Sequence, residues 1–154
     1  MGRIFTMSKP PRSEQDVIEL LQEWSFLEAA TLQPMNRGAS NTTYLVNAQA
    51  DKFILKLYGD STLTAQIQYE HSLLLYLQSC DLSFAVPAPI LARLGETLVL
   101  VNRNNTPLRV ALFPLLPGQP VDRKNLRHTA AAGRALGELH LALARFEPEG
   151  ESAQ

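Results

Sequence analysis

The sequence has a single cysteine, Cys80, and no long apolar run. One cysteine excludes a disulfide framework and a four-ligand cysteine zinc site within one chain, which fits a reducing cytoplasm. Residues 1–13 contain no apolar run of signal-peptide length, and no later stretch approaches the roughly 18 apolar residues of a membrane span. We therefore expect a soluble, cytoplasmic protein with no membrane partner.

The chain also lacks an excess of charge of either sign. Its 14 Lys and Arg residues against 15 Asp and Glu leave a formal net charge of −1. No global field would draw such a protein to nucleic acid or to an anionic membrane, so any anion site must be local. The 154 residues, 45% of them apolar, are enough for a packed core.

Residue periodicity predicts an α+β fold that begins with a helix and a hairpin. A helix starts near Ser13, with apolar residues at spacings of three and four, and should pack against a sheet. Two extended runs, 43–46 and 53–58, flank a polar connection at 47–52. This pattern is typical of an antiparallel hairpin.

A second helix and two more strands follow the hairpin. Ser61 or Thr62 can cap the helix, which runs to about Ser79. The strands, 97–101 and 108–113, are joined by turn-forming residues. Together the patterns indicate four or five short antiparallel strands packed with a helix.

A proline-rich segment divides the chain. Residues 114–120 contain three prolines and a glycine, a stiff connector that neither a strand interior nor a helix would accept. Beyond it, a helix starts at Asp122 or Asn125 and ends near Ala144. The predicted organisation is a disordered N-terminus (1–12), an N-terminal lobe (13–116), a hinge with the start of a helical lobe (117–146) and a disordered tail (147–154).

Two charged residues occupy positions where apolar residues are expected. Strand alternation puts Lys56 on the same face as Ile54 and Tyr58. Glu70 falls in the middle of the apolar stripe of the following helix, where a lone carboxylate would cost several kcal/mol. That stripe consists of Leu63, Ile67, Leu74 and Leu77. We expect Lys56 and Glu70 to pair and to be kept for function. The alternatives are an ordinary buried ion pair, or a Lys56 that extends to solvent while Glu70 is only half buried.

An ordered set of motifs extends over residues 32–144. It comprises Gly38-x-x-Asn41-x-x-Tyr44, the strand 53–58, Glu70, Val86-Pro87-x-Pro89 and Leu136-Gly137-x-Leu139-His140. This set resembles the kinase-like small-molecule phosphotransferases, a group that includes aminoglycoside phosphotransferases, choline kinases and type II homoserine kinases. The resemblance implies a protein-kinase-like N-terminal lobe, in which a small antiparallel sheet packs with a helix, followed by a hinge and an incomplete helical lobe.

The resemblance also implies a phosphate-binding site. In this superfamily the strand Lys contacts the α and β phosphates of ATP and the helix Glu holds that Lys, roles that fall to Lys56 and Glu70. Backbone N–H groups and short side chains of the preceding loop would approach phosphate oxygens. That loop consists of Gly38, Ala39, Ser40 and Asn41. With a single glycine, an ordinary lead-in to the hairpin stays open as an alternative.

The hinge would hold the adenine through backbone groups. Members of the family use one hinge carbonyl and, two residues later, one hinge N–H, which by position are those of Pro114 and Leu116. Proline has a carbonyl acceptor and Leu116 has a free N–H, so the prolines of this segment remove neither of the two backbone groups that the adenine would need. Phe113 would form a wall of the adenine pocket.

The sequence lacks the catalytic loop of this superfamily. Phosphoryl transfer there needs an Asp at the acceptor hydroxyl, and an Asn and a second Asp for magnesium, on a His-x-Asp-x-x-x-x-Asn loop and a later Asp motif. His71, His128 and His140 are each followed two residues later by an apolar residue, so none opens such a loop. Magnesium is therefore implied only for a complete enzyme, and we expect no useful transfer from this chain.

Three hypotheses follow. The chain is the ATP-binding fragment of a kinase for a small amine or amino-acid-like acceptor, a nucleotide-binding or pseudokinase-like interaction module, or a structural domain with an ion pair. Exposed apolar residues on the last helix, such as Leu136 and Leu143, predict self-association. We expect His140, on the same helix, to be packed in the core and hydrogen-bonded.

Overall fold

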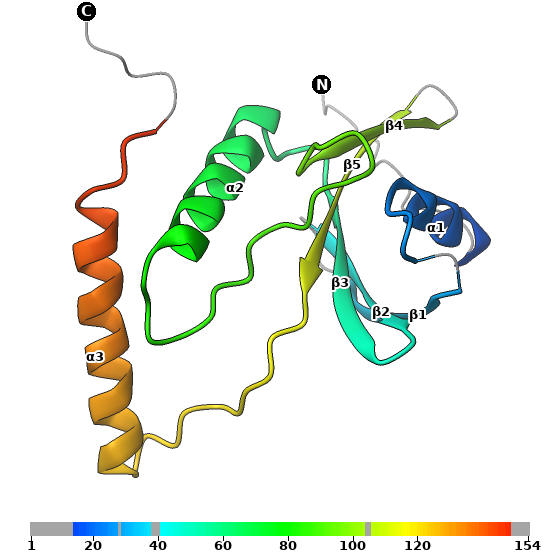
Figure 1. Cartoon of the computed structure of the whole chain (residues 1–154). Helices are drawn as coiled ribbons and strands as arrows, with labels where there is room; N and C mark the ends of the chain where they lie inside the picture. The colour runs from blue at the N-terminus through cyan, green and yellow to red at the C-terminus, as the bar shows by residue number, and fades with distance from the viewer. Residues whose placement is uncertain (1–13, 28, 38–40, 104–105, 149–154) are drawn as a thin grey trace, which may run out of the picture.

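The computed structural model describes residues 14–27, 29–37, 41–103 and 106–148 (Figure 1). Strands form one sheet with helices on both faces, which confirms the predicted α+β class. In chain order the elements are α1 (Glu14–Leu20), a 3-10 turn η1 (Leu21–Glu23), β1 (Thr31–Arg37), β2 (Asn41–Ala48), β3 (Asp51–Tyr58), α2 (Thr64–Ser79), β4 (Val99–Arg103), β5 (Thr106–Pro114) and α3 (Leu126–Leu143). The predicted disorder of residues 1–12 lies outside the described residues, as does most of the tail.

The sheet is antiparallel, with the strand order β1-β2-β3-β5-β4. The predicted hairpin is β2–β3, and the later pair of strands is β4–β5. β1 was not predicted as a strand. It contains Pro34 and a register irregularity between Pro34 and Asn36, features that an edge strand tolerates because it has a neighbour on one side only.

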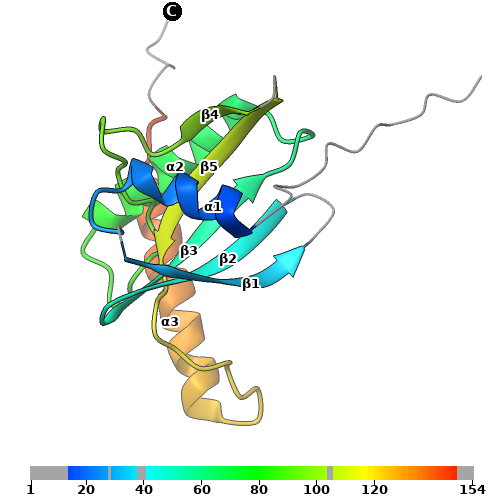
Figure 2. The same cartoon turned by 90° about the vertical axis from the view of Figure 1, so that its right-hand side faces the viewer.

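One face of the sheet is covered by α1 and η1, seen in front of the strands in Figure 2. Trp24 is buried there against the core, and its Nε1–H donates to the carbonyl of Ile90 at 3.1 Å. Leu55 in β3 and Leu112 in β5 are fully buried beneath this layer. The predicted packing of the first helix against a sheet is confirmed, and Ser13 itself lies outside the described residues.

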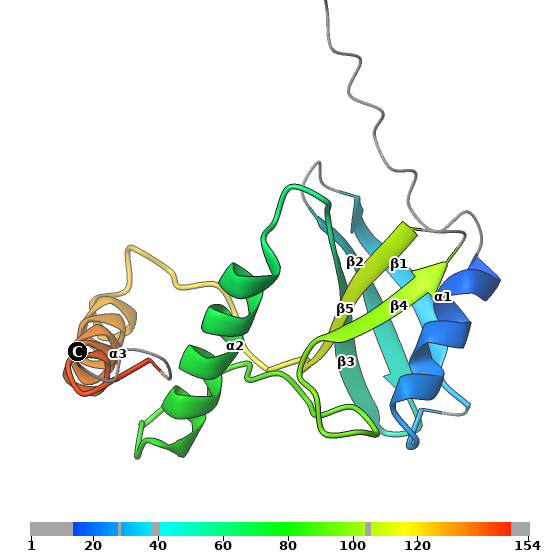
Figure 3. The same ribbon diagram turned by 90° about the horizontal axis from the view of Figure 1, so that it is seen from above.

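The opposite face of the sheet carries α2, as the view from above shows (Figure 3). Ile67 of α2 packs with Tyr58 of β3 and with Ala111 and Phe113 of β5. The predicted cap by Ser61 or Thr62 is wrong, because the N-cap position is Leu63 and no side chain caps the helix. Leu63 is also largely exposed, so the predicted apolar stripe does not start there.

The segment after β5 runs without regular structure to α3, which lies beside α2. Asn125 caps α3 as predicted, its side chain accepting from the N–H of Arg127 at 3.0 Å. Glu138 accepts from both the N–H and the hydroxyl of Ser83, each at 2.8 Å. These contacts fasten α3 to the loop that follows α2.

Much of the surface of α3 faces solvent. Leu136 is exposed as expected, Leu143 is only partly exposed, and Leu126 and Leu141 are exposed too. The prediction of a packed core histidine at position 140 is wrong, because His140 is exposed. None of the helices there is both long and apolar enough to span a membrane.

Candidate functional site

The centre of the site is the ion pair between β3 and α2. Lys56 lies opposite Thr43 of β2 and Ala111 of β5, on the sheet face that α2 covers. Its Nζ is 3.5 Å from Glu70 Oε1, which confirms the predicted pairing. The side chain of Glu70 is 50% exposed, against 22% for Lys56, which agrees with the alternative of a half-buried Glu70 and not with a fully buried pair. Such a solvent-accessible pair contributes only about 0–1 kcal/mol to stability.

Two aromatic rings lie beside the same ammonium group. Lys56 Nζ is 4.4 Å from the ring centroid of Tyr58 and 5.9 Å from that of Phe113. At these distances the negative face of a ring attracts a cation. The ammonium is therefore held by a carboxylate on one side and by buried aromatic rings on the other.

A buried histidine next to Glu70 links these groups to the rest of the fold. His71 is 1% exposed, and its Nε2 is 3.0 Å from the hydroxyl of Tyr58. Its Nδ1 is 2.9 Å from the hydroxyl of Thr97, in the loop before β4, and its ring meets Phe113 edge-on. The buried residues of α2 thus include His71, which directly follows Glu70 in the sequence.

Burial controls the protonation of this cluster. It lowers the pKa of His71, and the nearby Lys56 ammonium lowers that pKa further, while the Glu70 carboxylate raises it. Burial also raises the pKa of Tyr58, with a contribution from Glu70 in the same direction. His71 is consequently neutral and Tyr58 protonated near neutral pH. Sequence inspection missed this cluster, because an isolated histidine in a helix carries no signal of its partners.

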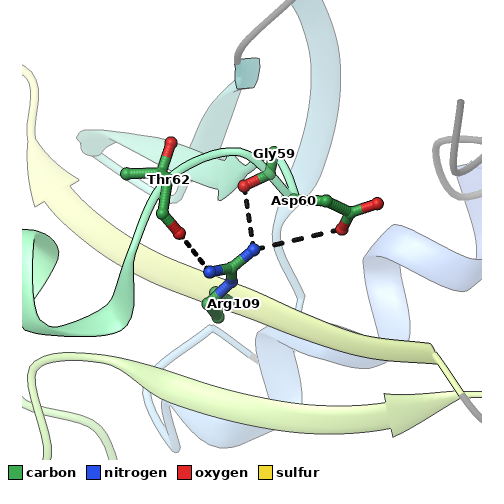
Figure 4. A network of polar contacts seen from close by, with 4 residues as sticks. All are labelled: Gly59, Asp60, Thr62 and Arg109. Carbon is green, nitrogen blue, oxygen red and sulfur yellow. Dashed lines mark hydrogen bonds and ion pairs between the residues drawn. The ribbon is translucent and has the colours of Figure 1, made fainter. Parts of the chain in front are cut away.

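Arg109 of β5 fixes the connection between β3 and α2 (Figure 4). Its guanidinium donates through Nη1 to the carbonyl of Thr62 and through Nη2 to the carbonyl of Gly59, the latter at 2.9 Å. Asp60 Oδ1 lies 4.0 Å from Nη2. Arg109 thus holds the turn that precedes α2 by donating to two of its carbonyls, and it caps none of the N–H groups of the helix.

Of the predicted phosphate loop, Gly38, Ala39 and Ser40 lie outside the described residues. Asn41 is the first residue of β2, opposite Tyr58 of β3. Its Oδ1 is buried without a hydrogen-bond partner in the described part of the chain. A carbonyl oxygen accepts hydrogen bonds and cannot pair with a phosphate oxygen, so only the amide N–H groups of Asn41 suit the predicted role.

The predicted adenine-binding residues lie at the end of β5 and just beyond it. Phe113 faces the α2 side and is buried, whereas Pro114 and Leu116 are partly exposed. The N–H of Leu115 donates to the carbonyl of Lys52 at 3.0 Å, so the segment after β5 starts as an extension of the β3–β5 ladder. The assignment of adenine contacts to these residues stays a prediction.

A hollow of about 410 Å³ lies between the start of β3 and the segment that follows β5. It is lined by Ala50, Asp51, Lys52, Phe53, Pro114, Leu115, Leu116 and Pro117. Phe53 stands three residues before Lys56 in β3, so strand alternation directs it to the opposite face of the sheet. This hollow is therefore separate from the Lys56–Glu70 pair.

Magnesium does not fit the residues that the structure describes. They contain no group of three or more His, Cys, Asp or Glu side chains placed to hold a metal ion. Glu70, the acidic residue at the site, is engaged with Lys56. The described residues therefore supply a cation for an anionic ligand and no ligand set for a metal.

Sequence comparisons place the chain among known phosphotransferases. A model of the phosphotransferase enzyme family matches residues 31–153. A homoserine kinase of Nitrobacter hamburgensis is 28% identical over 128 residues, which cover 82% of this chain and 37% of the relative. A homoserine kinase of Xanthobacter autotrophicus is 33% identical over 109 residues, which cover 71% of this chain and 32% of that relative. The chain thus spans well under half the length of these relatives.

Solved structures share the fold at low sequence identity. A microcompartment-associated aminopropanol kinase matches with a TM-score of 0.70 and 22% identity, covering 92% of this chain and 44% of that protein. An amicoumacin kinase, solved in complex with AMP-PNP and Ca²⁺, matches with a TM-score of 0.72 and 18% identity, covering 90% and 42%. Both alignments support a kinase-like N-terminal lobe.

Proposed function

Because the chain belongs to the phosphotransferase enzyme family, we propose that it forms the ATP-binding portion of a small-molecule kinase. In this proposal, residues 13–116 are the nucleotide-binding lobe, and residues 117–146 are the hinge and the start of a helical lobe. The observation that carries the proposal is the contact of Lys56 with Glu70 at 3.5 Å. This contact joins the strand Lys and the helix Glu, the two residues that by family resemblance position the phosphates.

The chemistry of this pair suits the phosphates of ATP. An ammonium group has three N–H donors, and Glu70 engages Lys56 from one side only. The side chain of Lys56 keeps 22% of its surface exposed, which leaves the remaining donors accessible to an anion. Lys56 would contact the α and β phosphates, and Glu70 would keep the ammonium in place.

The hinge offers backbone groups for the adenine. The carbonyl of Leu112 accepts from Ile90 N–H on the side away from β3, at 2.8 Å. Backbone groups alternate along a strand, so the carbonyl of Pro114 is directed to that same side. It would bind the adenine together with the N–H of Leu116, and Phe113 would wall the pocket. The loop at 38–41 would lie over the phosphates.

For the acceptor, we propose a small amine or amino-acid-like molecule with a hydroxyl group. The relatives named homoserine kinase and the aminopropanol kinase structure support this choice, because both named substrates carry an amino group and a hydroxyl group. Without a His-x-Asp-x-x-x-x-Asn loop, these 154 residues would not transfer the phosphoryl group by themselves.

A non-catalytic nucleotide-binding or pseudokinase-like module is the second candidate. It would use the same Lys56–Glu70 pair and would need no metal ligands for catalysis. Both candidates require nucleotide binding at Lys56. They differ in whether a longer chain with the catalytic loop phosphorylates an acceptor.

Thermal unfolding with and without ATP tests the proposal. A ligand present at about 100 times its Kd stabilises the folded state by about 2.7 kcal/mol. We expect ATP to raise the Tm of the wild-type chain and of Lys124→Met, an exposed-lysine control, but not of Lys56→Met. Equal ATP-induced shifts in Lys56→Met and the wild type would contradict the role of Lys56. No shift in the wild type would contradict nucleotide binding itself.

A further inference from the structure

The two groups that hold Lys56 differ in how firmly they are themselves held. The Glu70 side chain is half exposed, so water and salt screen its attraction for the ammonium. Tyr58 is 6% exposed, and its ring centroid is 4.4 Å from Lys56 Nζ. A desolvated ring attracts a cation more strongly than an exposed one. The better-anchored support of Lys56 is therefore the ring, provided that the ring stays in place.

His71 determines the place of that ring. Its Nε2 is 3.0 Å from the Tyr58 hydroxyl, and its Nδ1 is 2.9 Å from the Thr97 hydroxyl. The phenol is the stronger hydrogen-bond donor of the two, so Nε2 accepts from Tyr58 and Nδ1–H donates to Thr97. A neutral imidazole satisfies both contacts at once. The contacts join α2, β3 and the loop before β4.

The charged and titratable groups around His71 agree with a neutral ring. From β3 it faces Tyr58 and the Lys56 ammonium, and on its own helix it neighbours Glu70. From β5 the uncharged ring of Phe113 meets it edge-on. The loop before β4 contributes the uncharged hydroxyl of Thr97. A second cation here would be buried close to Lys56, which Coulomb repulsion disfavours.

We propose that His71 is a positioning residue for Lys56, which it serves by holding the Tyr58 hydroxyl and so keeping the Tyr58 ring against the ammonium. The functional part of this inference rests on the proposed binding of ATP by Lys56. With the Tyr58 ring fixed, the Lys56 ammonium stays in position even though water screens its attraction to Glu70. The ammonium would then contact the phosphates in a single orientation. His71 itself touches no phosphate.

The first test needs no nucleotide. Side-chain protons of Lys56 that lie over an aromatic ring resonate upfield of those of an exposed lysine, which NMR of the full chain measures. We expect this upfield shift in the wild type and in His140→Gln, an exposed-histidine control. His71→Gln and Tyr58→Phe should both lose most of it. Tyr58→Phe keeps the ring and removes only the hydroxyl, so it remains informative if His71→Gln fails to fold.

The second test is a double-mutant cycle on the Kd of ATP. We expect His71→Gln and Tyr58→Phe each to weaken ATP binding by about two- to thirtyfold, the range that a cation–π contact spans. The double variant should bind no worse than either single variant, because both break the same path to Lys56. A purely structural histidine would instead give multiplicative losses.

Each outcome decides one question. An unchanged Lys56 shift in both variants overturns the positioning role of His71, as do multiplicative losses in the cycle. No ATP binding by the wild type overturns the proposed function, and with it the functional part of the inference. In that case the Lys56 shift still decides whether His71 holds the ring. Loss of the Lys56 shift, together with a double variant that binds ATP no worse than either single variant, supports the positioning role of His71 and the binding of ATP at Lys56.

Discussion

Removal of the Arg109 guanidinium should destabilise the fold more than any change to its acidic partner. Hydrogen bonds from a charged donor contribute about 1.5–3 kcal/mol each. Arg109 makes two of them, to the carbonyls of Gly59 and Thr62, with a side chain that is 14% exposed. Both carbonyls belong to partly exposed residues and regain some water when the partner is lost. We therefore expect Arg109→Met to lower the free energy of unfolding by about 2–4 kcal/mol.

The contribution of Asp60 should be small. Its carboxylate is 4.0 Å from the guanidinium and 58% exposed, and such pairs contribute about 0–1 kcal/mol. Asp60→Asn is thus a matched control that keeps the side-chain shape. Arg109→Lys should fall between the two, because an ammonium does not reproduce the fork that reaches two carbonyls.

Urea unfolding followed by circular dichroism measures these differences. We expect Arg109→Met to lower the midpoint with an unchanged m value, and to lower the Tm by roughly 2–4 °C for each kcal/mol lost. Hydrogen exchange should also become faster at the start of α2 in Arg109→Met. If Asp60→Asn costs as much as Arg109→Met, the ion pair and not the two carbonyl contacts holds this turn, and the reasoning fails.

Three further predictions concern the core, the contact of α3 with the loop after α2, and the surface of α3. Leu55→Ala, at a fully buried position, should cost about 2–5 kcal/mol in urea unfolding, whereas Leu141→Ala, at an exposed one, should cost little. Hydrogen bonds from Ser83 lower the pKa of Glu138, so the Glu138 carboxylate should stabilise the fold above the ordinary carboxyl pKa and lose this effect as the pH falls through the lowered pKa. The Tm of the wild type, measured between neutral pH and about pH 3, should fall in acid, and Glu138→Gln should show a smaller fall. Sedimentation velocity should show self-association that Leu136→Lys with Leu141→Lys reduces, and a monomeric wild type would contradict it.

Local patterns predicted most of the elements because alternation and helical spacing reflect burial directly. The hairpin and the helix cap at Asn125 belong to this class. β1 is not predicted from the sequence, because Pro34 interrupts the alternation of apolar and polar residues that would indicate a strand. An edge position, which makes the proline acceptable, is a property of the sheet and not of the segment.

The candidate site shows the same division between local and tertiary information. Lys56 and Glu70 stood out because each breaks an apolar pattern, and their pairing followed. The centre of the apolar stripe of α2 was predicted one helix position, or about 100° around the axis, away from the buried residue His71, and Glu70 is half exposed. His71 takes the buried position because Tyr58 and Thr97 satisfy its ring, and these partners come from other parts of the chain. No local pattern reveals them.

The proline of β1 bears on how copies of the chain can assemble. Open sheet edges are templates for growth into extended aggregates, since an unpaired strand offers a row of backbone donors and acceptors. At the β1 edge, Pro34 has no amide hydrogen, and the irregularity before Asn36 puts the remaining groups out of step with an incoming strand. Strand addition is therefore disfavoured at the β1 edge, whereas β4, the strand at the other edge of the sheet, contains no proline.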